Sequence, residues 1–488
     1  MTALRIALFA DSAPQFLVRA LQAQATSLGT PCEIQSYAFT SPLAVQEELA
    51  AFQPDVVLLW RCAEAVTDAP FEPLEPILEL PYTFIAYTMV SREDGAYGSC
   101  ALTQERSLRK RLLRFNLHLA ELAEARHNLH LIDLDWLQSQ RGRAATFDPR
   151  LWETASLAFT PQTYPAMATA TLQLINALRG QLHKVLVTDL DNTFWGGIIG
   201  ESGSDAVNPD APGFKAYRQW LRALASRGIL LAIASHNDRD AVEAQFAKAD
   251  LGLSLEDFLV CEINWDPKAE MLKRIAAQLH VNLDSLVFID DRLEQREQVR
   301  AALPQVTVPE LPEDPACRLP FLSSANLFET PRITADDCQR ARTFKEEALR
   351  ETAAQTLSRA EYIASLEQVL IAEPLSPENC ERAAQLTQRC NRFNMRGTRH
   401  TAAELAQRRG WVYALRDKYG DLGTISVVVL DGDVIETWVM SCRVFNRDVE
   451  TLILNHLKSV APIRGAYRAT ERNMLCEHIY ANHGIPLP

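Results

Sequence analysis

Residues 185–197, VLVTDLDNTFWGG, decide how this chain can fold and what it can do. The short apolar run at 185–187 is typical of a buried strand, and it leads directly to Asp189 and Asp191. Ligands of open α/β sheets bind beyond the carboxyl ends of the strands, so both carboxylates are expected at such an edge. Two negative charges this close together favour a bound cation. Mg²⁺ and a phosphate, with one carboxylate free to attack phosphorus, would satisfy the arrangement.

Three later segments offer further groups for the same site. GILLAIASHND (228–238) has the pattern of a strand that ends in polar side chains, which suit phosphoryl oxygens. INWDPKAEML (263–272) places a lysine at the start of a helix, and SLVFIDDRLEQRE (285–297) ends a buried strand in two more acids. Each segment alone also fits a turn or a helix cap, but their order and helix-length spacing favour one shared site. The candidate residues are Ser235, His236, Asn237, Lys268, Asp290 and Asp291.

The motifs DLDNT (189–193), SHND (235–238), PK (267–268) and FIDD (288–291) resemble those of the haloacid dehalogenase (HAD) superfamily of phosphotransferases. The WGG that follows DLDNT resembles the FkbH-like proteins within it. The resemblance implies a Rossmann-like core in which Asp189 becomes an aspartyl-phosphate. Asp191 would protonate the leaving group and then activate water. Together, these segments and the resemblance predict catalysis by Asp189, Asp191 and Lys268, Mg²⁺ ligation by Asp189, Asp191, Asp290 and Asp291, and substrate contacts by Thr193, Ser235, His236, Asn237 and Arg443.

Composition limits the range of partners and compartments. The chain has 488 residues, enough for about three domains, and its apolar runs are strand length. Ten scattered cysteines without a C-x-x-C pair, and an N-terminus unlike a signal peptide, favour the cytoplasm. A net charge of −13 disfavours nucleic acid and anionic membranes. The same charge would repel an acidic carrier protein, so docking of such a partner requires a local basic patch.

Three blocks can be drawn, and together they predict an α/β protein. Residues 1–179 alternate strand and helix patterns, which predicts a parallel sheet, and their order resembles an SGNH-hydrolase-like domain. Ser12 and Asp148 could serve an esterase, but no histidine follows Asp148 at the required spacing, so we expect a non-catalytic scaffold or docking domain. Residues 180–333 form the HAD-like core, which has no room for a large cap domain and exits through a proline-rich segment expected to be extended.

Residues 334–488 resemble the N-acetyltransferase-like (GNAT) α+β fold, with Asn473 and Tyr480 in its closing strand and helix. The groove of that fold accepts a pantetheine arm. In FkbH-like proteins a glyceryl unit derived from 1,3-bisphosphoglycerate passes through an enzyme cysteine to an acyl carrier protein. Cys442 is the first candidate for that thiol, because it precedes a helix and has Arg443 and Arg447 nearby in sequence.

Cys390 is the second candidate, and a buried structural cysteine is the alternative for either thiol. Three functions follow from the sequence. The first is a bifunctional phosphatase and glyceryltransferase that loads a carrier protein for polyketide-type biosynthesis. The second is a plain phosphatase of a small phosphometabolite. The third is a non-catalytic docking protein for a carrier.

Overall fold

The computed structural model describes residues 3–66, 73–92, 95–199, 207–248, 250–390, 392–470 and 473–487. It divides into two compact units, Met1–Thr334 and Ala335–Pro488. In the parts of the chain that are described, no helix combines the length and apolar character needed to cross a bilayer.

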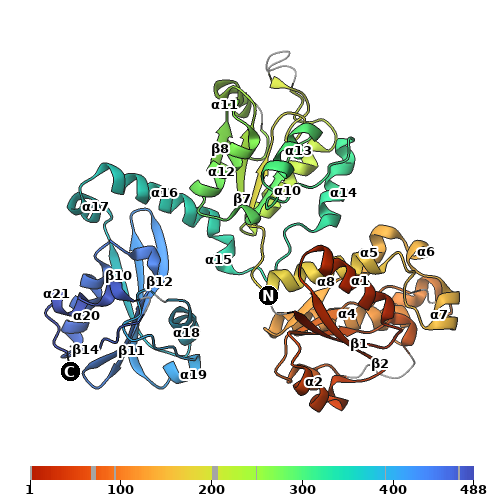
Figure 1. Ribbon diagram of the computed structural model, residues 1–488, viewed down its shortest axis with the longest axis horizontal. Coiled ribbons are helices and arrows are strands. Elements are labelled where there is room, and N and C mark those ends of the chain that lie inside the picture. Colours follow the sequence, from red (N-terminus) through yellow and green to blue (C-terminus); the bar gives the residue numbers. More distant parts are fainter. Residues whose placement is uncertain are drawn as a thin grey trace. The chain divides into compact units, whose positions relative to one another are not determined.

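The first sheet of the first unit has five parallel strands in the order β2-β1-β3-β4-β5. Its inner strands β3 and β4 are fully buried apolar runs, and α1 and α8 lie side by side over it (Figure 1). The strands are β1 (Leu4–Ala10), β2 (Cys32–Ala38), β3 (Val56–Trp60), β4 (Phe84–Tyr87) and β5 (Leu129–Ile132). The helices are α1 (Gln15–Ser27), α2 (Gln46–Phe52), α3 (Glu75–Leu78), α4 (Leu108–Ala125), α5 (Leu134–Arg141), α6 (Arg143–Thr146), α7 (Pro149–Ala155) and α8 (Tyr164–Leu178).

The second sheet of this unit has four parallel strands in the order β8-β7-β6-β9. Because β6 is central, its carboxyl end is flanked by those of β7 and β9. The strands are β6 (Val185–Thr188), β7 (Leu230–Ser235), β8 (Val260–Ile263) and β9 (Leu286–Ile289). The helices are α10 (Phe214–Ser226), α11 (Arg239–Lys248), α12 (Lys268–Gln278), α13 (Leu293–Ala302) and α14 (Pro315–Ala325).

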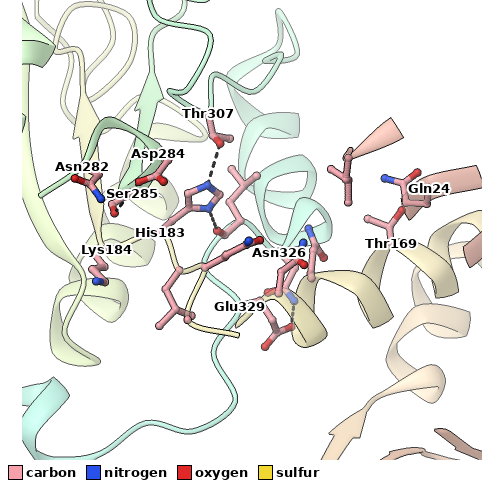
Figure 2. A pocket seen from close by; sticks show the side chains of 17 residues that line it. Gln24, Thr169, His183, Lys184, Asn282, Asp284, Ser285, Thr307, Asn326 and Glu329 are labelled. Atoms are coloured by element: carbon pink, nitrogen blue, oxygen red, sulfur yellow. Dashed lines mark hydrogen bonds between the residues drawn. The ribbon is translucent and has the colours of Figure 1, made fainter. Parts of the chain in front are cut away.

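A cavity of about 660 Å³ lies at the opposite, amino end of this second sheet (Figure 2). Lys184 and Ser285, which line it, directly precede β6 and β9. His183 in its wall is held on both ring nitrogens, by the Thr307 hydroxyl and the Leu327 carbonyl. The cavity is therefore separate from the carboxyl-end site that the sequence predicts.

The second unit has a five-stranded sheet in the order β10-β11-β12-β13-β14, antiparallel except for the last pair. Helix α20 packs on one face and α18 with α19 on the other (Figure 1). The strands are β10 (Val369–Pro374), β11 (Arg409–Asp417), β12 (Gly420–Asp431), β13 (Val434–Met440) and β14 (Arg464–Gly465). The helices are α15 (Ala335–Cys338), α16 (Arg340–Thr356), α17 (Arg359–Ser365), α18 (Cys380–Arg389), α19 (Ala402–Leu405), α20 (Val449–Val460) and α21 (Ile479–Asn482).

One segment differs from its sequence-based expectation. The proline-rich exit from the core is not extended throughout, because Asp314 accepts a hydrogen bond from the Ala316 amide and Pro315 occupies the first turn of α14. Proline is tolerated there, since the first amides of a helix have no intrahelical partner. Pro320 lies inside the same helix, which the sequence alone argued against.

Candidate active site

The register of the second sheet brings the first and last acidic motifs together. Thr188 pairs with Ile289, so Asp189 and Asp290 leave adjacent strands at the same level. The Asp189 amide donates to the Ile289 carbonyl at 2.9 Å. The two strands are short, buried and parallel, so the polar side chains that follow them lie together at the carboxyl edge of the sheet.

Lys268 lies at the centre of these acids. It begins α12, is 2 % exposed, and its Nζ lies 2.5 Å from Asp189 Oδ1 and 3.3 Å from Asp290 Oδ2. The same Nζ also donates to the Ala234 carbonyl of β7. A buried ammonium that donates to two acceptors and forms an ion pair with a second carboxylate is fixed in place, as a group that contacts a phosphoryl oxygen must be.

Asp189, Asp290 and Asp291 could together hold a metal ion. One carboxylate oxygen from each lies within 4.8 Å of the others. Burial, followed by the charge of Asp189, raises the pKa of Asp290 to about 7, and burial also raises the pKa of Asp291. Asp290 Oδ2 is buried and accepts no hydrogen bond within the described structure. A divalent cation would satisfy this oxygen and offset the mutual repulsion, so the donor set fits a hard, oxygen-loving ion.

Asp191 stands outside this metal-binding group, although the sequence placed it among the ligands. Its Oδ1 accepts from the Trp195 indole at 2.9 Å, and its Oδ2 accepts from the Asn237 amide at 3.1 Å. Burial raises the pKa of Asp191. A carboxyl that is held by two neutral donors and whose protonated form is favoured is suited to proton transfer.

The predicted substrate-contact residues take different places. Ser235 is buried at the end of β7 and its hydroxyl accepts from Asn237 at 3.1 Å. Thr193 is committed to Asp291, whose amide donates to the threonine hydroxyl at 3.0 Å and whose carboxylate accepts from it at 3.2 Å. Thr193 therefore positions an acid. His236 bonds the Asp266 carbonyl and stacks on Trp265, so it lies at the rim.

Sequence reasoning missed three residues that shape the site. Trp195, fully buried, orients Asp191 through its indole. Arg318 of α14 donates to the Asn192 carbonyl and so holds the loop between Asp191 and Thr193, where Asn192 has φ +50°. Trp265 is 76 % exposed beside His236. The WGG signature and Arg318 were visible in the sequence, but their contacts depend on tertiary structure.

The two candidate thiols both lie in the second unit. Cys442 is exposed and begins a short 3-10 turn two residues after the end of β13, and the next α-helix, α20, begins only at Val449. Arg447 does not serve it as a cation, because its guanidinium is buried and paired with Glu347. Burial raises the pKa of the Cys390 thiol to about 11, which favours the unreactive thiol form. Cys442, next to the exposed Arg443, is thus the more accessible of the two.

The esterase residues weighed in the first block are not arranged for catalysis. Ser12 is fully buried behind the end of β1. Asp148 caps α7 and bonds the Arg150 side chain at 2.7 Å. An orienting acid that is already committed to an arginine is a poor partner for a catalytic base.

Comparisons with known proteins agree with this geometry. A family model described as "FkbH, N-terminal domain" matches residues 77–176. The solved N-terminal part of the protein BF1531 from Bacteroides fragilis, which contains a phosphatase domain complexed with Mg, is 27 % identical, with a TM-score of 0.64. The match covers 68 % of this chain and 95 % of that one.

A HAD family enzyme from Bacteroides thetaiotaomicron, solved with magnesium and inorganic phosphate, matches at 11 % identity over 47 % of this chain and 92 % of its own. Its TM-score is 0.19, so this likeness carries no weight. No curated protein matches the chain. Taken with the acidic site on the four-stranded sheet, the match to the FkbH N-terminal domain and the likeness to the solved phosphatase-domain protein support an FkbH-like enzyme of the HAD type.

Proposed function

We propose that this protein is a Mg²⁺-dependent phosphatase that works through a phosphorylated Asp189, and that it also transfers a three-carbon acyl unit to a carrier protein. The observation that carries the first activity is the juxtaposition of Asp189, Asp290 and Asp291 around buried Lys268. The solved relative contains Mg in a phosphatase-domain structure, which supports the same ion here. Bound at the three carboxylates, Mg²⁺ would neutralise phosphoryl charge.

The residues of the chain divide the work of phosphate transfer. A carboxylate oxygen of Asp189 forms the new bond to phosphorus while the bond to the leaving oxygen breaks. Asp191, whose pKa is raised, donates its proton to that oxygen. In the second half, Asp191 takes a proton from water, and the water oxygen attacks phosphorus and releases Asp189. Lys268 and the Ser235 hydroxyl contact the phosphoryl oxygens throughout.

The second proposed activity, acyl transfer, involves Cys442 in the second unit. The thiolate of exposed Cys442 would attack the acyl carbonyl carbon, forming a thioester while the bond from that carbon to the phosphate oxygen breaks and phosphate leaves, with Arg443 beside it to contact the acyl or phosphate oxygens. The antiparallel sheet flanked by helices supports a GNAT-like second unit that could accept a pantetheine arm. The parallel first sheet likewise supports an SGNH-like scaffold. The acyl source would be derived from 1,3-bisphosphoglycerate, and an acyl carrier protein would be the partner.

Two variants test the two activities separately. The purified protein is incubated with Mg²⁺, a 1,3-bisphosphoglycerate source and a holo acyl carrier protein, and phosphate release and intact masses are measured. With a small phosphate ester as the substrate, Asp189→Asn should abolish phosphate release and Cys442→Ala should leave it intact. With the acyl phosphate and the carrier, Cys442→Ala should remove the thioester adduct. Release of phosphate from the ester by the Asp189→Asn variant would refute the phosphatase, and loading by the Cys442→Ala variant would refute the thiol assignment.

A further inference from the structure

A surface of the second unit is rich in arginine although the chain as a whole has a charge of −13. We call it the arginine surface. Arg468 donates through Nε and an η nitrogen to the Arg396 carbonyl, at 3.1 and 2.6 Å. The Arg392 guanidinium lies 5.8 Å from the centroid of Phe445, three residues after Cys442. Its members are Arg392, Arg396, Arg399, Arg443 and Arg468.

Part of the charge on this surface has no counter-charge within the described structure. Arg392, Arg399, Arg443 and Arg468 are exposed and Arg396 is half-buried. Three of the five, Arg392, Arg396 and Arg468, form no ion pair with any described carboxylate. Arginines elsewhere in this unit, such as Arg350, Arg408 and Arg464, are paired with acids. Exposed cations without acidic partners create a local positive potential on this otherwise acidic protein, and such a potential attracts an anionic partner.

Exposed apolar side chains border these arginines. Met474 is 74 % exposed and Leu475 is 54 % exposed. The segment that carries Met474 and Leu475 is held beside the arginine surface, because the Asn473 side-chain amide donates to the carbonyls of Asn394 and Arg468. The Cys476 thiol lies 3.5 Å from the Arg392 carbonyl. Methionine and arginine together are enriched in protein interfaces, so this mixture indicates a protein partner rather than a small anion.

The position of Cys442 connects the surface to chemistry. Residues 393–395 run antiparallel to the end of β13, with the Met440 amide bonded to the Phe393 carbonyl. Cys442 follows the end of β13 by two residues and Arg443 comes next, so the thiol lies beside the arginine surface. We infer that the arginine surface docks an acidic amphipathic helix of a partner protein, with its apolar side on Met474 and Leu475, and so presents that partner's arm to Cys442. This inference rests on the proposed acyl transfer and names the docking surface for it.

Equilibrium binding to the full chain tests the inference without needing the natural partner. The probe is a fluorescein-labelled, Glu-rich helical peptide with a leucine stripe. The control peptide has lysine in place of every glutamate. The acidic peptide should bind, more tightly at low salt, and the basic one should not. Arg392→Glu and Met474→Glu should each weaken binding about tenfold, whereas Arg392→Lys should restore it.

Arg409→Glu is the matched control. Arg409 is exposed on the same sheet, but it pairs with Leu430 at the other end of β12, so it should change affinity less than about twofold. Equal binding of the two peptides, or equal losses in Arg392→Glu and Arg409→Glu, would overturn the inference. Phosphate release, measured on the same proteins, reports on the proposed phosphatase alone. A protein that releases phosphate but ignores the acidic peptide therefore refutes only the docking surface.

Discussion

The pKa of Asp290 should make cation binding at the acidic site depend on pH. Burial and the charge of Asp189 raise its pKa to about 7 and Lys268 lowers it, so near neutral pH a proton competes with a metal ion. The folded protein binds this proton more tightly than the unfolded chain does. Without a cation, this residue therefore makes folding less favourable as pH rises from about 4 through 7.

The pH dependence of Mg²⁺ binding follows from this competition. Lowering pH from 8 to 6 should weaken Mg²⁺ affinity about tenfold, since most Asp290 is ionised at the higher pH and protonated at the lower. Calorimetric titration at the two pH values would measure it. Asp290→Asn should bind Mg²⁺ more weakly and show a much smaller pH effect. An unchanged pH effect in this variant would assign the proton to another group.

Asp191 is expected to act twice, and a good leaving group can separate the two steps. With alkyl phosphates, Asp191→Asn should lower the rate of phosphate release about 10²–10⁴-fold, because the leaving oxygen receives no proton. With p-nitrophenyl phosphate, the first step needs no acid. The variant should then release a burst of one nitrophenolate per enzyme molecule. Slow turnover should follow, because hydrolysis of the phosphorylated Asp189 lacks its general base. A slow reaction without a burst would contradict the assignment.

Thr193 is expected to act through Asp291 and not on substrate. Thr193→Val keeps the shape of the side chain but removes both hydrogen bonds to Asp291. We expect Mg²⁺ affinity to fall about tenfold, within the range seen when residues that orient metal ligands are changed. Thr193→Ser should restore it. If saturating Mg²⁺ does not recover the rate of Thr193→Val, the hydroxyl contacts the phosphate instead.

At the scale of elements, strands with a continuous apolar run were readable from the sequence, and strands without such a run were not. β6, β7 and β9 are continuous buried runs, so their place and the polar side chains beyond them could be predicted. β2 is an exposed edge strand with few apolar residues, and β10 is only half-buried, so neither pattern stood out. The contact of Arg318 with the Asn192 carbonyl depends on the packing of α14 beside the loop after β6, which no local sequence pattern encodes.

The packing of α10 against α14 depends on Gly213. It has φ +89°, and a Cβ there would lie 2.4 Å from the Pro315 carbonyl. Gly213→Ala should therefore lower the stability of the first unit by about 3 kcal/mol, as strain and overpacking add. Thermal melts would show it. Gly252→Ala is the control, because Gly252 also has positive φ but open space around it, and it should cost about 1 kcal/mol. Equal losses would show that backbone strain alone matters.

At the scale of the whole molecule, the two proposed chemistries fall in different units. The acids, Lys268 and the loop held by Arg318 all belong to Met1–Thr334. Cys442 and the arginine surface belong to Ala335–Pro488. Each unit has its own sheets and core, so each should fold without the other. The solved part of BF1531 is itself an N-terminal part that contains a phosphatase domain.

Truncation after Thr334 should therefore separate the activities. The fragment Met1–Thr334 should release phosphate from small phosphate esters with kcat/KM within about threefold of the full chain, since every group that contacts phosphate stays in place. It should form no thioester, because the fragment lacks Cys442 and the arginine surface, to which the proposal assigns acyl transfer and docking. Mixing in Ala335–Pro488 as a separate chain should restore little loading, because the link that raises the local concentration of one unit near the other is cut. Loss of phosphate release from a fragment that melts cooperatively would mean that the second unit completes the phosphatase site, and the division of labour proposed here would be wrong.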